Sequence, residues 1–456
     1  MAEAAPISGQ LKELLRLVER TTYGGSRQWA GLVESMGYEG FIDWQLQGEA
    51  IDDGGLEDAL SNLLPTLSMD AATLANHVFE ERNFGDAQRD LAVATIIRQI
   101  YSPRQLLERM VEFWSDHFNV PINSVQSGYF KALEDRDTIR PLALGSFENL
   151  LMGSAKSPAM LFYLDNFSST AEGPNENYAR EMLELHTLGV GGGYSEEDIK
   201  ETARVFTGWS IREPAQFNYY SLIHDYGSKT VLGEVIEPTG LSEGENLLRR
   251  VAAHESTARF ISTKLVRRFV ADDPEPDVVD SVARSFLDSG GDIRVTLKTL
   301  LMLPQVRQTL SLKLKRPNEF SAAMLRGLEI ELDNAALTVH YQSLVAGGQL
   351  PFSWPAPNGY PDARAYWQST NGFLMRFNQA SALPGQALRS SALLQEAARL
   401  DGLDAQINLL ERGLRPQGLG ADERSLLKRY SRRLPASQRP AALASWILGG
   451  PESQWR

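Results

Sequence analysis

The chain has 456 residues, of which 43% are hydrophobic and 23% are charged, as in a globular protein without long disordered segments. It carries 45 lysines and arginines against 58 aspartates and glutamates. The resulting net charge of −13 argues against nucleic acid as a partner, because phosphates would be repelled. The absence of cysteine excludes disulfides, a cysteine nucleophile, thiolate zinc sites and iron–sulfur clusters.

The first ten residues contain neither the basic nor the apolar region of a signal peptide. No run of the chain approaches the ~18 apolar residues that a membrane span requires. We therefore expect a soluble protein without a membrane span. It is cytoplasmic as written, and periplasmic or exported if a signal has been removed.

Helical periodicity dominates the sequence. Leu11, Leu14, Leu15 and Val18 follow the i, i+3, i+4, i+7 spacing of an amphipathic helix over residues 11–21. The helix over 103–118 has Ser102 as its expected N-cap. Further helices are predicted over residues 90–101, 147–152, 176–188, 195–207, 241–253, 257–269, 276–289, 293–302, 319–326, 372–382, 391–400 and 423–430.

Two segments depart from the helical pattern. Residues 209–239 are rich in aromatic and β-branched residues with turn signals, which predicts a short β-hairpin or an irregular insertion. Residues 347–360, which include Trp354 and three prolines, form a long loop of the kind that often carries function. The fold class is therefore mainly α, a large multi-helix globular array with a hairpin insertion around residues 209–239.

For the domain organisation we expect two helical halves. Residues 1–240 form the N-terminal half, which carries the motifs and the hairpin insertion, and residues 241–456 form the C-terminal half. One continuous domain is the alternative.

The first polar motif is Glu112-Phe-Trp-Ser-Asp-His-Phe. On a helix, Phe113 and Trp114 lie four and three positions before His117 and share its face. His117 is therefore a candidate general base or metal ligand held against an aromatic wall. The alternative is a core histidine with one satisfied hydrogen bond.

The second motif begins at Pro174, with Asn175 as the expected N-cap. Asn177, Arg180, Glu181 and Glu184 then form one polar stripe on a helix that is otherwise largely apolar. Such a helix is usually buried, and buried charges must be paired or bind an ion. The stripe is therefore a candidate site. The alternative is structural, with Arg180 bonding Glu184 and a carboxylate of another helix.

His186 lies near the C-terminal end of this helix and off the polar stripe, so a three-ligand metal face on this one helix is not expected. The glycines at 189–193 follow a helix rather than a strand, which favours a C-cap and a tight turn over a phosphate loop. Ser195 and Asp198 then predict a capping box at the start of the next helix.

The third motif is the pair His224 and Asp225, with Lys229 nearby. In a loop these residues can orient one another, with Asp225 fixing the tautomer of His224 or of another histidine. A solvated turn is the alternative. Four further residues are candidates to pair with or wall the same centre: Arg109, Arg140, Arg204 and Trp209.

The chain resembles the bacterial family catalogued as domain of unknown function 1800, from about residue 13 to its end. The most specific match is Pro174-Asn-Glu-Asn-Tyr-Ala-Arg-Glu-Met-Leu-Glu-Leu-His-Thr-Leu-Gly-Val. The other matches cover residues 20–25, 112–118, 158–166, 203–209, 224–233, 269–274, 315–320 and 447–454. The resemblance implies no established reaction. Many members look exported, unlike this chain, and many are encoded beside a sulfatase-like protein, which is the partner that the resemblance implies.

A second, shorter resemblance is to animal-type haem peroxidases. It rests on Arg180-Glu181 followed by Ala203-Arg204 and Gly208. It implies that one of three histidines, His117, His186 or His224, would be the iron ligand.

Three hypotheses follow, and whether the chain is an enzyme stays open among them. In the first, a hydrolase-like enzyme acts with a divalent metal or by direct acid–base catalysis, on a saccharide or envelope substrate. Its candidate catalytic residues are His117, Glu181, Glu184, His186, His224 and Asp225. Its supporting residues are Arg180, Asn177, Trp114, Arg204 and Trp209, and its candidate metal ligands are His117, Glu181, His186 and His224. The second is a haem peroxidase-like redox protein. The third is a non-catalytic scaffold that binds a partner through the Trp354 loop.

Overall fold

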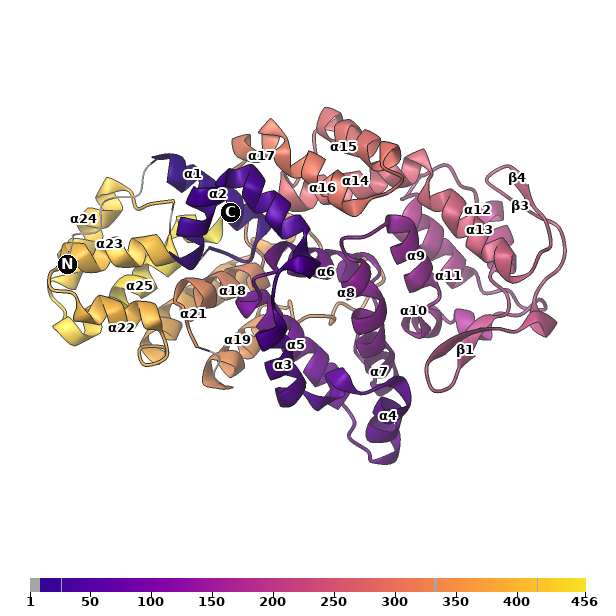
Figure 1. The fold of residues 1–456 in the computed structure, drawn as a ribbon, viewed down its shortest axis with the longest axis horizontal. Helices are drawn as coiled ribbons and strands as arrows, with labels where there is room; N and C mark the ends of the chain where they lie inside the picture. Colours follow the sequence, from indigo (N-terminus) through magenta and orange to yellow (C-terminus); the bar gives the residue numbers. More distant parts are fainter. Residues whose placement is uncertain (1–8, 26, 332–333, 416) are drawn as a thin grey trace.

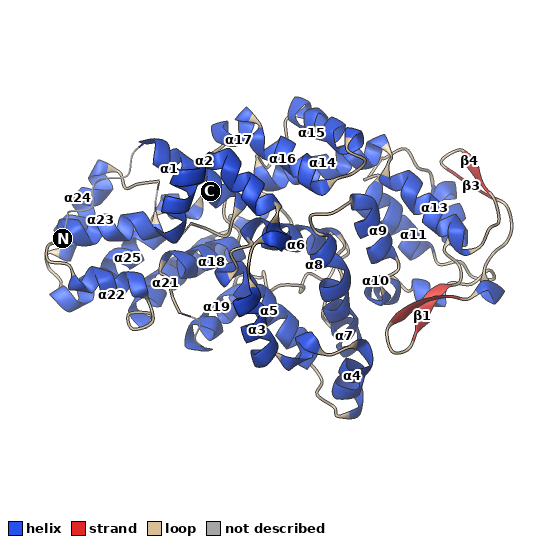
Figure 2. Cartoon of the chain, in the orientation of Figure 1, coloured by secondary structure: helices blue, strands red, loops and turns tan. Residues whose placement is uncertain are grey.

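The computed structural model describes residues 9–25, 27–331, 334–415 and 417–456, and this part of the chain is mainly α-helical (Figure 2). The N-terminal helices are α1 (Gly9–Thr21), α2 (Arg27–Leu46), α3 (Gly54–Leu63), α4 (Ala71–Ala75), α5 (Asp86–Tyr101), α6 (Gln105–His117), α7 (Val125–Glu134), α8 (Arg140–Leu142), α9 (Phe147–Ala155), α10 (Pro158–Tyr163), α11 (Glu176–Glu181) and α12 (Glu196–Val205). Three π-helical turns continue α4, α7 and α11, over Asn76–Glu80, Asp135–Ile139 and Met182–Thr187.

The remaining helices follow two small hairpins. They are α13 (Leu241–Ala252), α14 (Glu255–Phe269), α15 (Pro276–Asp288), α16 (Ile293–Met302), α17 (Pro304–Gln308), α18 (Pro317–Gly327), α19 (Asn334–Ala346), α20 (Arg364–Trp367), α21 (Thr370–Gln386), α22 (Ala392–Arg399), α23 (Leu403–Leu414), α24 (Ala421–Ser431) and α25 (Arg439–Gly449). None of the helices formed by described residues is both long and apolar enough to cross a membrane.

The helices predicted from periodicity are all present, and most of them have shifted ends. The start of α6 differs from the prediction in its capping residue. Ser102 was expected to cap this helix, but its hydroxyl donates to Asp53 Oδ2 at 2.6 Å and the helix begins only at Gln105. Periodicity does not predict α2, because glycines interrupt its pattern, and Gly37, with φ +69°, kinks it.

The expected insertion is confirmed, but it holds two hairpins instead of one. Strand β1 (Trp209–Arg212) pairs antiparallel with β2 (Gln216–Tyr219), and β3 (Lys229–Val231) pairs antiparallel with β4 (Glu234–Ile236). Each short strand pairs with its neighbour in sequence, since the closest available turn costs the least loop entropy.

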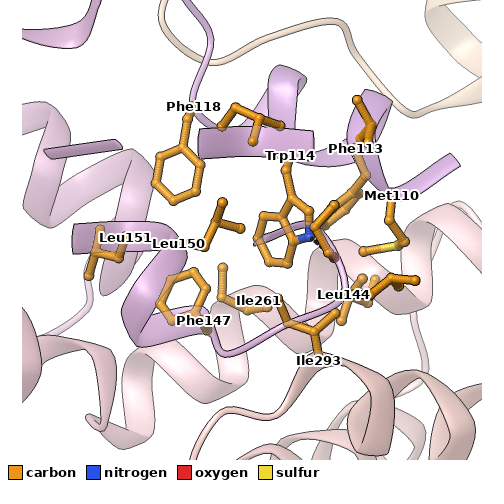
Figure 3. Packing of buried hydrophobic residues seen from close by; sticks show 14 of the residues in the cluster. Met110, Phe113, Trp114, Phe118, Leu144, Phe147, Leu150, Leu151, Ile261 and Ile293 are labelled. Atoms are coloured by element: carbon orange, nitrogen blue, oxygen red, sulfur yellow. Dashed lines mark hydrogen bonds between the residues drawn. The ribbon is translucent and has the colours of Figure 1, made fainter. Parts of the chain in front are cut away.

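The hydrophobic core has two main parts. The larger cluster joins buried residues between positions 17 and 306, and the second joins α18 to α25 with parts of α5. Figure 1 shows the result as an elongated molecule, with α22–α25 at one end, α12, α13 and the hairpins at the other, and α6 near the middle. The larger core packs around Trp114, whose indole lies among apolar side chains of α6, α9, α14 and α16 (Figure 3).

The C-terminal segment returns from α25 to the middle of the molecule (Figure 1). Trp455 forms an isolated β-bridge with Leu314, and Arg456 exchanges backbone hydrogen bonds with Lys313. The side chain of Arg456 then reaches the carbonyl oxygen of Arg20 on α1. The start of α18, the end of α1 and the last residues of the chain therefore meet beside α6.

Candidate functional site

A network of buried charges occupies the centre of the molecule, and Glu319 is its focus. The five arginine side chains that gather there are each at most 3% exposed: Arg20, Arg109, Arg268, Arg316 and Arg456. Glu319 accepts hydrogen bonds from Arg109 and Arg456 and from the backbone N–H of Arg316. Burial alone would raise the pKa of Glu319, but the surrounding arginines lower it well below its ordinary value. Glu319 is therefore held as a carboxylate.

Two acids on successive turns of α6 extend this network. Glu112 lies 2.6 Å from Arg316 Nη2 and accepts a hydrogen bond from the hydroxyl of Tyr23 at 2.8 Å. Asp116 receives a longer hydrogen bond, 3.3 Å, from Arg316 Nη1. Because Arg316 is shared, Asp116 has weaker compensation than Glu112. Burial accordingly raises the pKa of Asp116 to about 6, against the opposing charge of Arg316.

A cavity of about 210 Å³ lies next to Asp116, between α6, α14 and the loop before α20. The side chains and backbone that line it are those of Phe113, Asp116, Lys264, Arg267, Arg268, Asn358, Gly359, Tyr360, Pro361 and Asp362. Asp362 is committed to ion pairs with Arg268 and Lys313, both at 3.3 Å. Asp116, by contrast, has one ion pair, with Arg316 at 3.3 Å, and it shares that arginine with Glu112.

The loop closes on α6 through Gly359. A Cβ at this position would lie 2.0 Å from the carbonyl oxygen of Asp116, and its φ of +70° is in the left-handed region. Only glycine meets both conditions without displacement. Asn119 also holds the loop, donating to the carbonyl oxygens of Trp354 and Ala356 at 2.9 and 2.7 Å. The loop that was predicted to carry function is therefore a wall of the cavity.

Lys264, on α14, also lines this cavity. Its Nζ donates to Nδ1 of His117 at 2.9 Å. The other ring nitrogen of His117, Nε2, donates to the carbonyl oxygen of His186 at 3.1 Å, which fixes the Nε2–H tautomer and leaves Nδ1 as an acceptor. Burial, with the charge of Lys264 and the neighbouring His186, lowers the pKa of His117 well below its ordinary value, so its ring is neutral.

The amine of Lys264 has no carboxylate within ion-pair distance among the described residues. Burial lowers its pKa from 10.5 to about 8, with Asp116 and Asp362 opposing the shift and Arg267 adding to it. The cavity thus holds an amine and a carboxyl whose pKa values lie on either side of neutrality. Groups with such values can exchange protons with a bound molecule at physiological pH.

The structure brings three of the predicted residues together beside this cavity: His117, His186 and Trp114. The ring centroids of His117 and His186 are 6.1 Å apart, and Trp114 contacts His117 edge-on at 5.4 Å. Burial lowers the pKa of His186 to about 3. Trp114 is fully buried and donates its indole N–H to the carbonyl oxygen of Ala143 at 2.9 Å. His117 contacts Lys264 directly, and His186 and Trp114 pack around His117 in the core.

The polar stripe of α11 was expected to be buried, and this expectation is wrong. Asn177 is exposed, and the three charged residues of the stripe are only partly buried: Arg180, Glu181 and Glu184. The buried face of this helix is formed by Tyr178, Ala179 and the apolar residues that follow, so the polar stripe faces outward. Arg180 forms its bidentate pair with Glu196 of α12, at 2.8 and 2.7 Å, rather than with Glu184.

The other stripe residues have local partners. Glu184 accepts a hydrogen bond from the hydroxyl of Tyr194 at 3.3 Å, and burial beside Glu184 raises the pKa of Glu181. The predicted caps around this helix are confirmed. Asn175 accepts from the N–H of Asn177. Ser195 and Asp198 form the capping box of α12.

The hairpin histidine belongs to a separate buried network. His224 Nε2 lies 3.0 Å from Glu243 Oε1, and Nδ1 donates to the carbonyl oxygen of Thr207 at 2.8 Å. Lys229 contacts the other oxygen of Glu243 at 2.7 Å. Asp225 was expected to orient a histidine, but it pairs with Arg204, at 2.6 and 3.1 Å. Glu243, which comes from α13, is the partner that fixes His224.

The predicted metal ligands therefore lie in three different places. His117 and His186 lie together in the core behind Lys264, Glu181 lies on the outer side of α11, and His224 lies beside the hairpins. Within the described ranges of the chain, no three histidine, aspartate or glutamate side chains form a group that could hold a metal ion. Trp209, a predicted wall residue, is fully buried and packs against Phe206 and Phe217.

Sequence reasoning missed Lys264 and Asp116. Asp116 directly precedes His117 in a motif that was recognised, but its side chain gave no spacing signal. Lys264 lies in an ordinary amphipathic pattern, where a lysine is usually a solvated residue. Only the packing of α14 against α6 shows its amine pointing inward.

The fold and the site define a mainly α-helical protein with a buried ionic network and, beside it, a cavity lined by acidic and basic side chains. The chain belongs to the family described as "Protein of unknown function (DUF1800)", whose family model matches residues 16–455. No curated protein and no solved structure matches it significantly.

Proposed function

We propose that this protein is an enzyme that performs acid–base chemistry on a small anionic molecule bound in the central cavity. The observation that carries the proposal is that the amine of Lys264 and the carboxyl of Asp116 line one cavity with pKa values near 8 and 6. Lys264 forms no ion pair with the described carboxylates, and Asp116 forms one, at 3.3 Å from Arg316. Structural charges in a protein interior are normally paired closely, so this arrangement favours a chemical role.

The charge of the cavity supports an anionic substrate. Lys264 and Arg267 lie one helical turn apart on α14 and both line the cavity. Arg267 donates its Nε–H to the carbonyl oxygen of Asp272 at 3.1 Å, and none of the described carboxylates forms an ion pair with it. Two cations without carboxylate partners favour a ligand that brings its own carboxylate or phosphate. The volume of about 210 Å³ restricts that ligand to a small molecule.

The two groups have complementary roles. As a carboxylate, Asp116 accepts a proton from the substrate or from a water molecule. As an ammonium group, Lys264 donates a proton to the oxygen or nitrogen that gains electrons. A second cavity of about 20 Å³ also borders Asp116, and it has room for about one water. Such a pair serves hydrolysis, as the sequence suggested, and also isomerisation by proton transfer.

The test is a screen of small carboxylates and phosphate esters against the full-length protein. Binding is read as a rise in melting temperature, and turnover of each stabilising compound is followed by ¹H NMR in D₂O. At least one compound should bind and change, or exchange a carbon-bound proton for deuterium. Asp116→Asn should retain binding and lose turnover, because the amide keeps the shape but cannot take a proton.

The controls separate the cavity from the surface. Lys264→Met should lose both binding and turnover, whereas Lys200→Met, on the exposed side of α12, should lose neither. The proposal is wrong if no compound stabilises the wild type, or if Lys264→Met and Asp116→Asn bind and turn over every compound as the wild type does.

A further inference from the structure

We propose that Lys264 is a covalent nucleophile, which forms an imine with a small carbonyl compound carrying a carboxylate, that is, a 2-oxo acid. This inference rests on the proposed function and names the substrate class of the same site. It follows from the partner of Lys264, from the position of Arg267 and from the acid that faces them.

Lys264 is partly buried, and its hydrogen-bond partner differs from those of the fully buried lysines of the described chain. Four lysines that are at most 5% exposed each have a carboxylate within ion-pair distance, in the pairs Lys131–Glu134, Lys229–Glu243, Lys313–Asp272 and Lys315–Glu19. Each of those four amines therefore has an opposite charge as its direct partner. Lys264 instead donates to the neutral imidazole of His117, which stabilises the ammonium form far less. Its amine is therefore readily available with a free electron pair.

His117 also determines where that amine points. Its ring is buried, stacked parallel to Phe113 and fixed by the hydrogen bond from Nε2 to the carbonyl oxygen of His186. Nδ1 is thus a fixed acceptor that holds Nζ of Lys264 at the cavity wall. We assign His117 as a positioning residue, because it acts through Lys264 and is absent from the cavity lining.

The lining of the cavity selects the substrate. Arg267, three residues after Lys264, is the cation placed to bind a carboxylate while the adjacent carbonyl carbon lies at Nζ. Phe113 and Pro361 supply apolar wall for a short carbon chain. Two acids face this space, Asp116 from α6 and Asp362 from the loop, and Asp362 is engaged by Arg268 and Lys313. Asp116 is therefore the acid that donates a proton once it is itself protonated, while Lys264 acts as the uncharged amine; these are the reverse of their roles as a carboxylate and an ammonium group.

The steps balance without an oxidant or reductant. The uncharged Nζ attacks the carbonyl carbon, a C–N bond forms, and the C=O π electrons move to oxygen. One N–H proton passes to that oxygen and gives the carbinolamine. The carboxylic acid of Asp116 then protonates the hydroxyl group, the C–O bond breaks and water leaves. The product is a protonated imine of Lys264 beside the carboxylate of Asp116.

The test is reductive trapping of the full-length protein with pyruvate and cyanoborohydride at neutral pH, followed by peptide mass mapping. Hydride reduces an imine to a secondary amine, so the modified lysine gains the mass of pyruvic acid less one oxygen atom. We expect one modified site, Lys264, with labelling at this position at least about tenfold above that of any surface lysine. Lys264→Arg should remove the label at this position and leave that of the other lysines unchanged, whereas Lys200→Arg should leave the label at Lys264 unchanged.

The carboxylate contact is tested with Arg267→Gln. A charge-assisted hydrogen bond contributes roughly tenfold or more in affinity, so this variant should need about ten times more pyruvate for the same labelling. Ethyl pyruvate has the same ketone without the charge. It should label the wild type and Arg267→Gln equally.

Labelling that is spread over surface lysines and is unchanged in Lys264→Arg would overturn the imine. If small carboxylates then still stabilise the wild type and not Arg267→Gln, acid–base chemistry at the cavity stands and only the covalent step is wrong. If neither trapping nor stabilisation occurs, both proposals are wrong. Circular dichroism and the melting temperature of Lys264→Arg establish that the variant is folded.

Discussion

The guanidinium group of Arg456 donates to both carboxylate oxygens of Glu319, at 3.1 and 3.2 Å, although 137 positions separate the two residues. Both side chains are almost completely buried. Arg456 also donates to the carbonyl oxygens of Arg20 and Arg268. The C-terminal segment therefore joins α1, α14 and α18 at the centre of the molecule, next to the cavity.

Replacing Arg456 with methionine should be strongly destabilising. The change keeps an unbranched side chain but leaves two carbonyl groups and part of Glu319 without hydrogen bonds in the interior. Breaking one side of a buried ion pair costs about 3–5 kcal/mol in the free energy of unfolding. Urea unfolding measures this. The control is Arg249→Met, whose guanidinium is half exposed and lies 3.5 Å from Glu148; it should change stability by less than about 0.5 kcal/mol. Equal losses of stability in Arg456→Met and Arg249→Met would contradict the buried, hydrogen-bonded position of Arg456.

Glu319→Gln should alter the dependence of stability on pH. The pKa of Glu319 lies well below its ordinary value of 4.5 in the folded protein, because the arginines outweigh the effect of burial. The contribution of the Glu319 carboxylate to the free energy of unfolding is therefore present above about pH 4.5 and is lost as the pH falls through the folded-state pKa. The wild type should exceed Glu319→Gln in stability at pH 7, and the gap should narrow below pH 4.5. Urea titrations at pH 7, 5 and 3.5 test this; a gap that does not narrow would show that Glu319 is not the carboxylate stabilised by these arginines.

Lys264 should titrate apart from the other lysines. After reductive ¹³C-methylation, its resonance should move with a pKa of about 8 and disappear in Lys264→Ala, while surface lysines titrate near 10.5. His117→Phe removes the acceptor of the ammonium form and should lower this pKa further, by up to about one unit for one hydrogen bond. His117→Gln, which restores an acceptor, should reverse most of the change. A pKa of Lys264 that is identical in all three proteins would exclude His117 as its positioning residue.

Gly359→Ala should open the cavity wall. Its new Cβ would collide with the carbonyl oxygen of Asp116, so the loop before α20 must move away from α6. Gly348 is a matched control because its φ of +68° is nearly the same, while no atom lies within 4 Å of the position that a Cβ would take there. Gly348→Ala should cost only about 1–2 kcal/mol of left-handed strain, and Gly359→Ala should cost clearly more and abolish ligand-induced stabilisation. Equal costs for the two variants, with ligand binding intact in both, would mean that the loop is not fixed by this contact.

The sequence by itself determined most of the helices, because the spacing of apolar residues every three to four positions is a local property. The glycine turn that follows the helix end, with Gly189 at φ +83°, and the capping box of Ser195 with Asp198 were predictable for the same reason. It also placed His117 beside Phe113 and Trp114, since all three lie within two turns of α6. The insertion was located correctly, but its two hairpins were not resolved.

Only the tertiary structure decided which polar residues meet. The stripe of α11 had the residue types of a site, yet it faces outward, because the opposite face of that helix enters the core. His224 found its partner in Glu243 rather than in the adjacent Asp225. Lys264 meets His117 from 147 positions away, and Arg456 meets Glu319 from 137. Periodicity predicts which face of a helix is apolar, but it does not predict which two helices pack together. That packing creates the cavity and shifts the pKa values of Asp116 and Lys264.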